Sequence, residues 1–303
     1  MDALLKFITR ELKPYVTDLL KARSLFSFWE GEGMHIMPVH FYSPIPDTSK
    51  LPPSVWQKSS EMAGVDMNDE GQLSFIRDVL PLYRHEYEQF PLKSRGNRFE
   101  FSYDNTQFVG LDPVVLHSFV RHFRPARIIE VGSGYSTLVT AQALRLNGGG
   151  DLTCIEPFPR DFIREGVPGV SRLHQCSVQE IDLELFQQLG ENDILFIDST
   201  HVAKIGSDVL YLFFEVLPRL RPGVIVHIHD IFFPGEYPEK WIRENNFFWN
   251  EQYLLQAFLI GNSQFRVEYC VGYMGKRHLP ELQKLFPNYS CGMGGGSFWM
   301  RRI

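Results

Sequence analysis

Three segments before residue 125 carry apolar residues at helical spacing: 2–22, 71–90 and 112–123. Asp112 is the expected N-cap of the third helix, with Pro113 in its first turn. Residues 34–53 are rich in proline and serine, which is typical of an extended segment. The pattern predicts a helical and extended region over residues 1–110 that shapes a substrate site.

After residue 126 the pattern changes to short apolar runs that alternate with helical stretches. The expected strands are 127–131, 152–155, 172–176, 194–197, 224–228, 265–273 and 297–301, and the expected helices are 137–146, 209–220, 249–259 and 279–286. Short apolar strands that alternate with helices indicate parallel pairing with helices on both faces. We therefore expect an α/β domain over 111–303, a Rossmann-like doubly wound seven-stranded sheet, mostly parallel with a C-terminal antiparallel strand.

Charge and composition narrow the class of protein. The 303 residues carry a formal net charge of -6, which argues against a nucleic-acid partner because no basic excess matches a phosphate backbone. The four cysteines form no CxxC pair, and no apolar run is long enough to span a membrane. We expect a cytoplasmic protein without a membrane partner. The helices at 2–22 and 71–90 could pack within one chain or across a homodimer.

A glycine-rich loop joins the first strand of this domain to the next helix, in the segment EVGSGYST over residues 130–137. Glycine lets the backbone turn sharply and approach a ligand closely. A dinucleotide fingerprint would place a third glycine at Thr137. The loop instead follows Glu130, whose carboxylate would interact favourably with the positively charged end of a ligand. The residues expected to bind the ligand here are Glu130, Gly132, Ser133, Gly134 and Ser136.

The ends of the second and third strands carry further candidates. Glu156, followed by Pro157, can accept hydrogen bonds from the two hydroxyls of a ribose. Ser177 and Val178 would lie beside an adenine. The same ribose chemistry serves NAD enzymes, and Glu156 as a solvated surface acid is the plainer alternative. The loop and the strand ends together predict a nucleoside site.

A second group of polar residues follows the fourth and fifth strands. Asp198 and His201 come after one strand, and His229 and Asp230 end the other. In an open α/β sheet, ligands bind at the carboxyl ends of the strands. The alternative is that these side chains cap turns and satisfy buried polar groups.

The segments EVGSGYST, IEP, FIDSTH and RPGVIVHIHD resemble the class I S-adenosylmethionine-dependent methyltransferases, over about residues 127–230. The similarity is greatest to the metal-dependent macrolide-sugar and catechol-type O-methyltransferases. It implies S-adenosylmethionine as cofactor, bound also by Asp198, and methyl transfer to a hydroxyl of a small molecule. It implies Asp198 and Asp230 as catalytic metal ligands and His201 as the general base.

The sequence departs from those relatives at His229, where they carry an acid. An imidazole ligand beside Asp198 and Asp230 favours Mn, Fe or Zn over Mg. A divalent ion would lower the pKa of a bound hydroxyl, and His201 could then take its proton.

Two other functions stay open at this point. A nucleoside-binding protein without catalysis could act in regulation or assembly, although His201 and Asp230 are both present. An NAD-linked oxidoreductase could share the fold, although Glu130 and Thr137 count against it.

Overall fold

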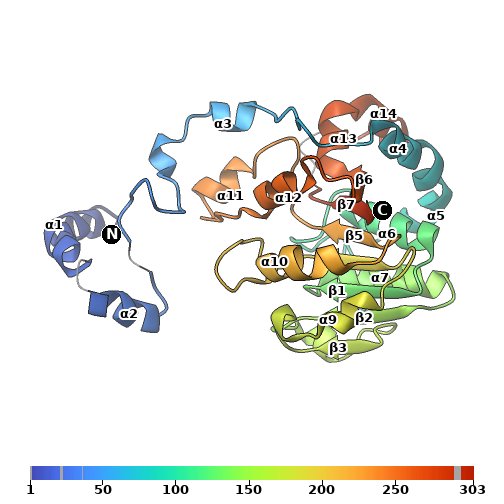
Figure 1. Ribbon diagram of the computed structural model, residues 1–303, viewed down its shortest axis with the longest axis horizontal. Helices are drawn as coiled ribbons and strands as arrows, with labels where there is room; N and C mark the ends of the chain where they lie inside the picture. Colours follow the sequence, from blue (N-terminus) through green and yellow to red (C-terminus); the bar gives the residue numbers. More distant parts are fainter. Residues whose placement is uncertain (1, 21–22, 36, 290–294) are drawn as a thin grey trace. The chain divides into compact units, whose positions relative to one another are not determined.

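The computed structural model describes residues 2–20, 23–35, 37–289 and 295–303 (Figure 1). The chain divides into two compact units, Met1–Pro52 and Pro53–Ile303. The first unit contains α1 (Asp2–Leu20), α2 (Arg23–Gly31) and a 3₁₀ turn (Thr48–Lys50). The helix expected over 2–22 is confirmed as far as Leu20, and residues 21–22 lie outside the described part. No helix among the described residues is both long and apolar enough to cross a membrane.

The second unit is built on a seven-stranded sheet in the order β3-β2-β1-β4-β5-β7-β6. Its strands are β1 (Arg127–Val131), β2 (Asp151–Ile155), β3 (Arg172–His174), β4 (Ile194–Ile197), β5 (Ile225–Ile228), β6 (Phe265–Cys270) and β7 (Phe298–Arg302). Only β7 runs against its neighbours in this sheet. The predicted fold class is confirmed. The strand order reverses beside β1, which lies between β2 and β4, and this is where α/β sheets bind ligands.

Helices cover both faces of the sheet, and each face has its own apolar core. Against the first face pack α4 (Asp69–Ser74), α5 (Arg84–Tyr87), α6 (Asp112–Phe123), α7 (Tyr135–Leu146), α8 (Asp161–Arg164), α13 (Val271–Arg277) and α14 (Leu279–Leu285). Against the second pack α9 (Leu183–Gln187), α10 (Asp208–Tyr211) and α12 (Glu251–Leu259). The short helices α3 (Ser54–Gln57) and α11 (Glu239–Arg243) complete the unit.

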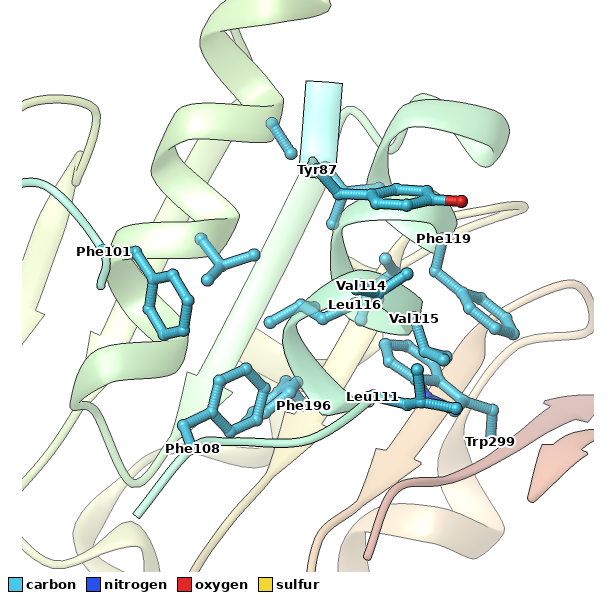
Figure 2. Close-up of a cluster of buried hydrophobic side chains, with 14 of the residues drawn as sticks. Tyr87, Phe101, Phe108, Leu111, Val114, Val115, Leu116, Phe119, Phe196 and Trp299 are labelled. Atoms are coloured by element: carbon cyan, nitrogen blue, oxygen red, sulfur yellow. The ribbon is translucent and has the colours of Figure 1, made fainter. Parts of the chain in front are cut away.

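The first core joins α6 to the sheet through aromatic rings (Figure 2). Phe119 of α6 stacks on Trp299 of β7, with ring centroids 4.0 Å apart. Phe108, which precedes α6, lies edge-on to Phe196 of β4 at 6.3 Å. Because α6 is buried along most of its length, it is fixed over the middle of the sheet.

The two helical stretches expected over 71–90 and 209–220 are present but irregular. In each, an α-helical turn passes into a π turn and then a 3₁₀ turn, at Phe75–Val79 and Leu80–Tyr83 and again at Leu212–Val216 and Leu217–Arg219. Each irregularity includes a proline, Pro81 or Pro218. Proline lacks the N–H of a regular helix and its ring crowds the preceding turn, so the backbone changes its hydrogen-bond spacing there.

Two details of the sequence interpretation are wrong. Asp112 is not the N-cap of α6 but lies inside its first turn, and its carboxylate accepts hydrogen bonds from the backbone N–H groups of Gly296 and Ser297, both at 3.0 Å. The strand expected over 265–273 ends at Cys270, which pairs with Phe298, the first residue of β7. Residues after Cys270 therefore have no partner strand, and they form α13.

The proposed functional division at residue 110 stays a prediction. Within the second unit, the helical stretch before that position is tied to α6 by charge. Glu86 of α5 accepts hydrogen bonds from Arg121 at 2.7 and 2.9 Å and pairs with His117 at 2.7 Å. Burial opposes ionisation of Glu86, but the hydrogen bonds to Arg121 and His117 outweigh it and lower its pKa.

We predict that Glu86→Ala lowers the free energy of unfolding by about 2–3 kcal/mol, since it removes the only carboxylate that pairs with Arg121 among the described residues and leaves Asn147 as a neutral partner. Glu88→Ala removes an exposed ion pair with Arg84 and should cost no more than about 1 kcal/mol. Because folding lowers the pKa of Glu86, its ionised carboxylate stabilises the folded protein at pH values above the usual pKa of 4.5. This stabilisation is lost as the pH falls through the lowered pKa of the folded state. Urea unfolding should therefore show a larger Glu86→Ala difference at pH 7 than at pH 3.5.

Candidate active site

Three adjoining cavities lie at the carboxyl ends of β1, β2, β4 and β5. The first, about 360 Å³, is lined by residues that follow β2, β3 and β4, and the second, about 200 Å³, by the glycine loop. The third, about 740 Å³, is lined by the residues after β4 and β5 and by an aromatic segment. Asp198 lines all three cavities. A ligand that fills the first two would therefore meet a ligand of the third beside Asp198.

The glycine loop is held tightly against the end of β4. Gly132 has a φ of +84°, and a Cβ on it would lie 1.7 Å from the carbonyl oxygen of Asp198. The N–H of Gly132 donates to Ile155 at 3.0 Å, and the N–H of Asp198 donates to Val131 at 2.8 Å. Only glycine fits at position 132, because both its φ and the space around it exclude a side chain.

Glu156 stands between the first and second cavities and lines both. Its carboxylate accepts hydrogen bonds from the N–H of Phe158 at 2.8 Å and from the N–H of Ser133 at 3.2 Å. Pro157, Ser177 and Val178 line the first cavity. The structure thus brings the residues proposed for a ribose and an adenine to one cavity.

The four polar residues after β4 and β5 also come together. His201 Nε2 lies 3.3 Å from Asp198 Oδ1 and 3.6 Å from Asp230 Oδ2. His229 Nε2 lies 3.7 Å from Asp230 Oδ1. All four line the third cavity.

Backbone strain marks this group. His201 has a φ of +60° and Asp230 a φ of +54°. Residues other than glycine rarely adopt this left-handed region, and each such position costs on the order of 1–3 kcal/mol. Contacts with the surrounding structure must therefore hold both residues in this conformation, which is common at functional sites.

The charges in this group are strongly coupled. Burial disfavours the charged form of His201, but its hydrogen bonds to Asp198 and Glu251 and the charge of Asp230 outweigh burial and raise its pKa well above the usual value. Burial raises the pKa of Asp230. His227, two residues before His229, is wholly buried, and burial lowers its pKa well below the usual value.

One residue of the site escapes the sequence interpretation. Glu251, the first residue of α12, is wholly buried, and its Oε2 lies 2.9 Å from His201 Nδ1. An acid in the first turn of a helix is usually explained by the helix dipole, so its position gives no signal of a partner 50 residues away.

Comparison with known proteins assigns the family. A family described as a methyltransferase domain matches residues 129–231, which include the glycine loop and the ends of β2, β4 and β5. An uncharacterised protein of Archaeoglobus fulgidus is 31% identical over 193 residues, covering 59% of this chain and 86% of that protein. The chain belongs to the class I S-adenosylmethionine-dependent methyltransferases.

Solved methyltransferases share less with this one. The O-methyltransferase TomG from Streptomyces achromogenes, involved in tomaymycin synthesis and solved with S-adenosylmethionine, is 17% identical, with a TM-score of 0.40 over 75% of this chain and 88% of TomG. The plantazolicin methyltransferase BpumL, solved with S-adenosylhomocysteine and a monoazolic desmethylPZN analogue, is 12% identical, with a TM-score of 0.40 over 78% of this chain and 98% of BpumL. At such TM-scores these two structures add nothing to the assignment.

Glu130 of the methyltransferase lies beneath the glycine loop and lines none of the three cavities described above. It is wholly buried and accepts a hydrogen bond from the hydroxyl of Ser136 at 2.5 Å, in the first turn of α7. Burial raises its pKa to about 8. The side chain of Glu130 therefore does not reach a ligand in these cavities. It stabilises the glycine loop through its hydrogen bond with Ser136.

The metal ligands expected in the methyltransferase are only partly grouped. Among the described residues, Asp198, His201 and Asp230 form a group whose ligand atoms all lie within 4.8 Å of one another. His229, the expected third ligand, is outside this group. Two carboxylates and an imidazole suit a divalent ion.

We predict that Gly132→Ala destabilises the methyltransferase by at least about 3 kcal/mol, because the new methyl group overlaps the Asp198 carbonyl in a left-handed backbone. Gly134→Ala is the matched control, since a Cβ there would meet no heavy atom within 4 Å. Thermal unfolding should separate the two variants. Equal melting temperatures for Gly132→Ala and the wild type would contradict the close approach of loop and strand.

Proposed function

We propose that this methyltransferase transfers the methyl group of S-adenosylmethionine to a hydroxyl oxygen of a small molecule. The observation that carries the proposal is that Asp198 lines three cavities at once, so cofactor and acceptor sites share a wall. In-line transfer needs little more than such alignment, which can lower a barrier by about 7–11 kcal/mol in favourable cases.

The two smaller cavities suit the two ends of the cofactor. The first would take the nucleoside, with Glu156 accepting from the ribose hydroxyls and Ser177 and Val178 beside the adenine. The second would take the amino-acid end, along Ser133, Gly134 and Ser136. Arg160 lines this second cavity and offers a charge for the carboxylate of that end. Asp198 would lie near the sulfonium, where a negative charge is favourable.

The large cavity suits an acceptor that contains a ring. Its wall contains four aromatic residues: Phe232, Trp241, Phe247 and Trp249. Phe247 and Trp249 stack with ring centroids 4.9 Å apart. Asp198 and Asp230 stand among its polar residues, and no lysine or arginine lines it among the residues that the structure describes. Flat apolar rings of the acceptor would pack against these aromatic side chains, so we propose a ring-containing acceptor.

The acid and histidine residues supply the proton chemistry. A neutral hydroxyl is a poor nucleophile, and His201 Nε2 would take its proton. A divalent ion bound by Asp198 and Asp230 would offset the negative charges that raise the pKa of His201, so that Nε2 would be free to accept that proton. Asp198, Asp230 and His229 would hold a divalent ion of the Mn, Fe, Zn or Mg type, and such an ion lowers the pKa of a hydroxyl. Asp198 and Asp230 also keep His201 oriented toward the cavity.

We predict that calorimetry detects S-adenosylhomocysteine binding and that Glu156→Gln weakens it roughly 10–100-fold, because charge-assisted hydrogen bonds to the ribose are lost. Glu184→Gln, at an exposed acid of α9, should leave the dissociation constant unchanged. Binding of NAD in place of S-adenosylhomocysteine would favour an oxidoreductase instead. Tight binding without transfer to any hydroxyl in an acceptor panel would favour a regulatory or assembly protein.

We predict that His201→Asn lowers kcat roughly 10²–10⁴-fold, the usual contribution of a general base, and leaves the metal content unchanged. His229→Asn should lower the metal content, measured by elemental analysis, and a chelator should suppress turnover of the wild type. If His201→Asn loses the metal while His229→Asn retains it, His201 is a ligand and not the base. Full turnover in chelator would remove the ion from the mechanism.

A further inference from the structure

The strongest unused feature of the site is the start of α12, where three consecutive residues surround His201. We propose that Glu251 is the positioning residue that fixes the His201 imidazole with Nε2 toward the acceptor cavity, an inference that rests on the proposed methyl transfer. Glu251 lines none of the three cavities described above, so it acts through His201 and not on a substrate.

The backbone of α12 holds His201 in its strained conformation. The N–H groups of Asn250 and Glu251 both donate to the carbonyl oxygen of His201, at 3.1 and 3.2 Å. The side chain of Asn250 accepts from the N–H of Ala203 at 2.6 Å, which fixes the chain just after His201. These bonds stabilise the left-handed φ of His201, which an unsupported histidine would rarely adopt.

The ring of His201 is fixed on its two remaining sides. The indole of Trp249 lies against it, with ring centroids 4.4 Å apart. Glu251 Oε2 lies 2.9 Å from Nδ1, and Glu251 is wholly buried. When Glu251 is ionised, its carboxylate only accepts hydrogen bonds, so Nδ1 carries a proton and the other ring nitrogen, Nε2, points at Asp198 and Asp230.

The burial of Glu251 indicates that it has this single task. Its second oxygen, Oε1, has no hydrogen-bond partner among the described residues. Isolating a carboxylate in this way is costly unless it is paired with a charge or a strong donor. Within the described site, the donor on Glu251 is His201, as expected for a carboxylate that orients an imidazole from behind.

Nuclear magnetic resonance of ¹⁵N-histidine-labelled protein tests this contact directly. In the wild type we expect a strongly deshielded proton on Nδ1 of His201, identified by its absence in His201→Asn. In Glu251→Gln this proton should move upfield or exchange too fast to observe. An unchanged signal in Glu251→Gln would overturn the proposal, whatever the acceptor.

Kinetics then separate positioning from a general loss of structure. With S-adenosylmethionine and catechol as the probe acceptor, Glu251→Gln should lower kcat about 10–100-fold while the KM for catechol and the dissociation constant of S-adenosylhomocysteine stay within about twofold. Asp193→Asn removes another buried acid, just before β4 at the amino ends of the strands, where it accepts from the N–H of Arg127 at 2.7 Å. It should lower the melting temperature comparably without changing kcat.

The outcomes distinguish this inference from the proposed function. A wild-type protein that neither binds S-adenosylhomocysteine nor methylates catechol or other hydroxyl compounds would contradict the methyl transfer, while the Nδ1 proton would still report on Glu251. A wild-type enzyme that transfers methyl groups, with a Glu251→Gln variant of equal kcat, would overturn the positioning role alone.

Discussion

The carbonyl oxygen of Asp198 occupies the space that a side chain at position 132 would need. This contact joins the ends of β1 and β4, the two strands at the centre of the sheet, with nothing between their backbones. It brings the glycine loop and Asp198 together, and Gly132 and Asp198 line both the first and the second cavity. The site exists because two backbones can approach this closely, which requires glycine.

The charged residues of the site line the third cavity, next to this contact. Asp198, His201 and Asp230 form a partly buried group, and two of the three residues, His201 and Asp230, have left-handed backbones. Neighbouring residues hold each of them. Gly296 packs so closely on Asp230 that a Cβ would lie 2.7 Å from its Cα, and the start of α12 holds His201. The fixed arrangement of the two acids and the imidazole thus costs some stability in backbone strain, as is common at catalytic sites.

Side-chain alternation along β1 explains why Glu130 lines none of the three cavities, although Glu156 and Asp198 do. Ile129 and Val131 point to the second core, so Glu130 between them points to the first, beneath α7. Glu156 and Asp198 come just after their strands, where alternation no longer applies and the side chains reach the cavities. The position of Glu156 and Asp198 after their strands therefore predicts that they line a cavity. The position of Glu130 within β1 predicts instead which face of the sheet its side chain lies on.

The sequence by itself determined the alternation of strands and helices, the glycine loop and the sheet edge that carries the site. Each of these depends on short-range periodicity or on the conformational freedom of one residue type. Only the tertiary structure decided that Glu251 supports His201, 50 residues away, and that Asp112 binds the backbone before β7, 184 residues away. Such contacts depend on how whole elements pack, and no local pattern records which distant backbone or ring a buried carboxylate will meet.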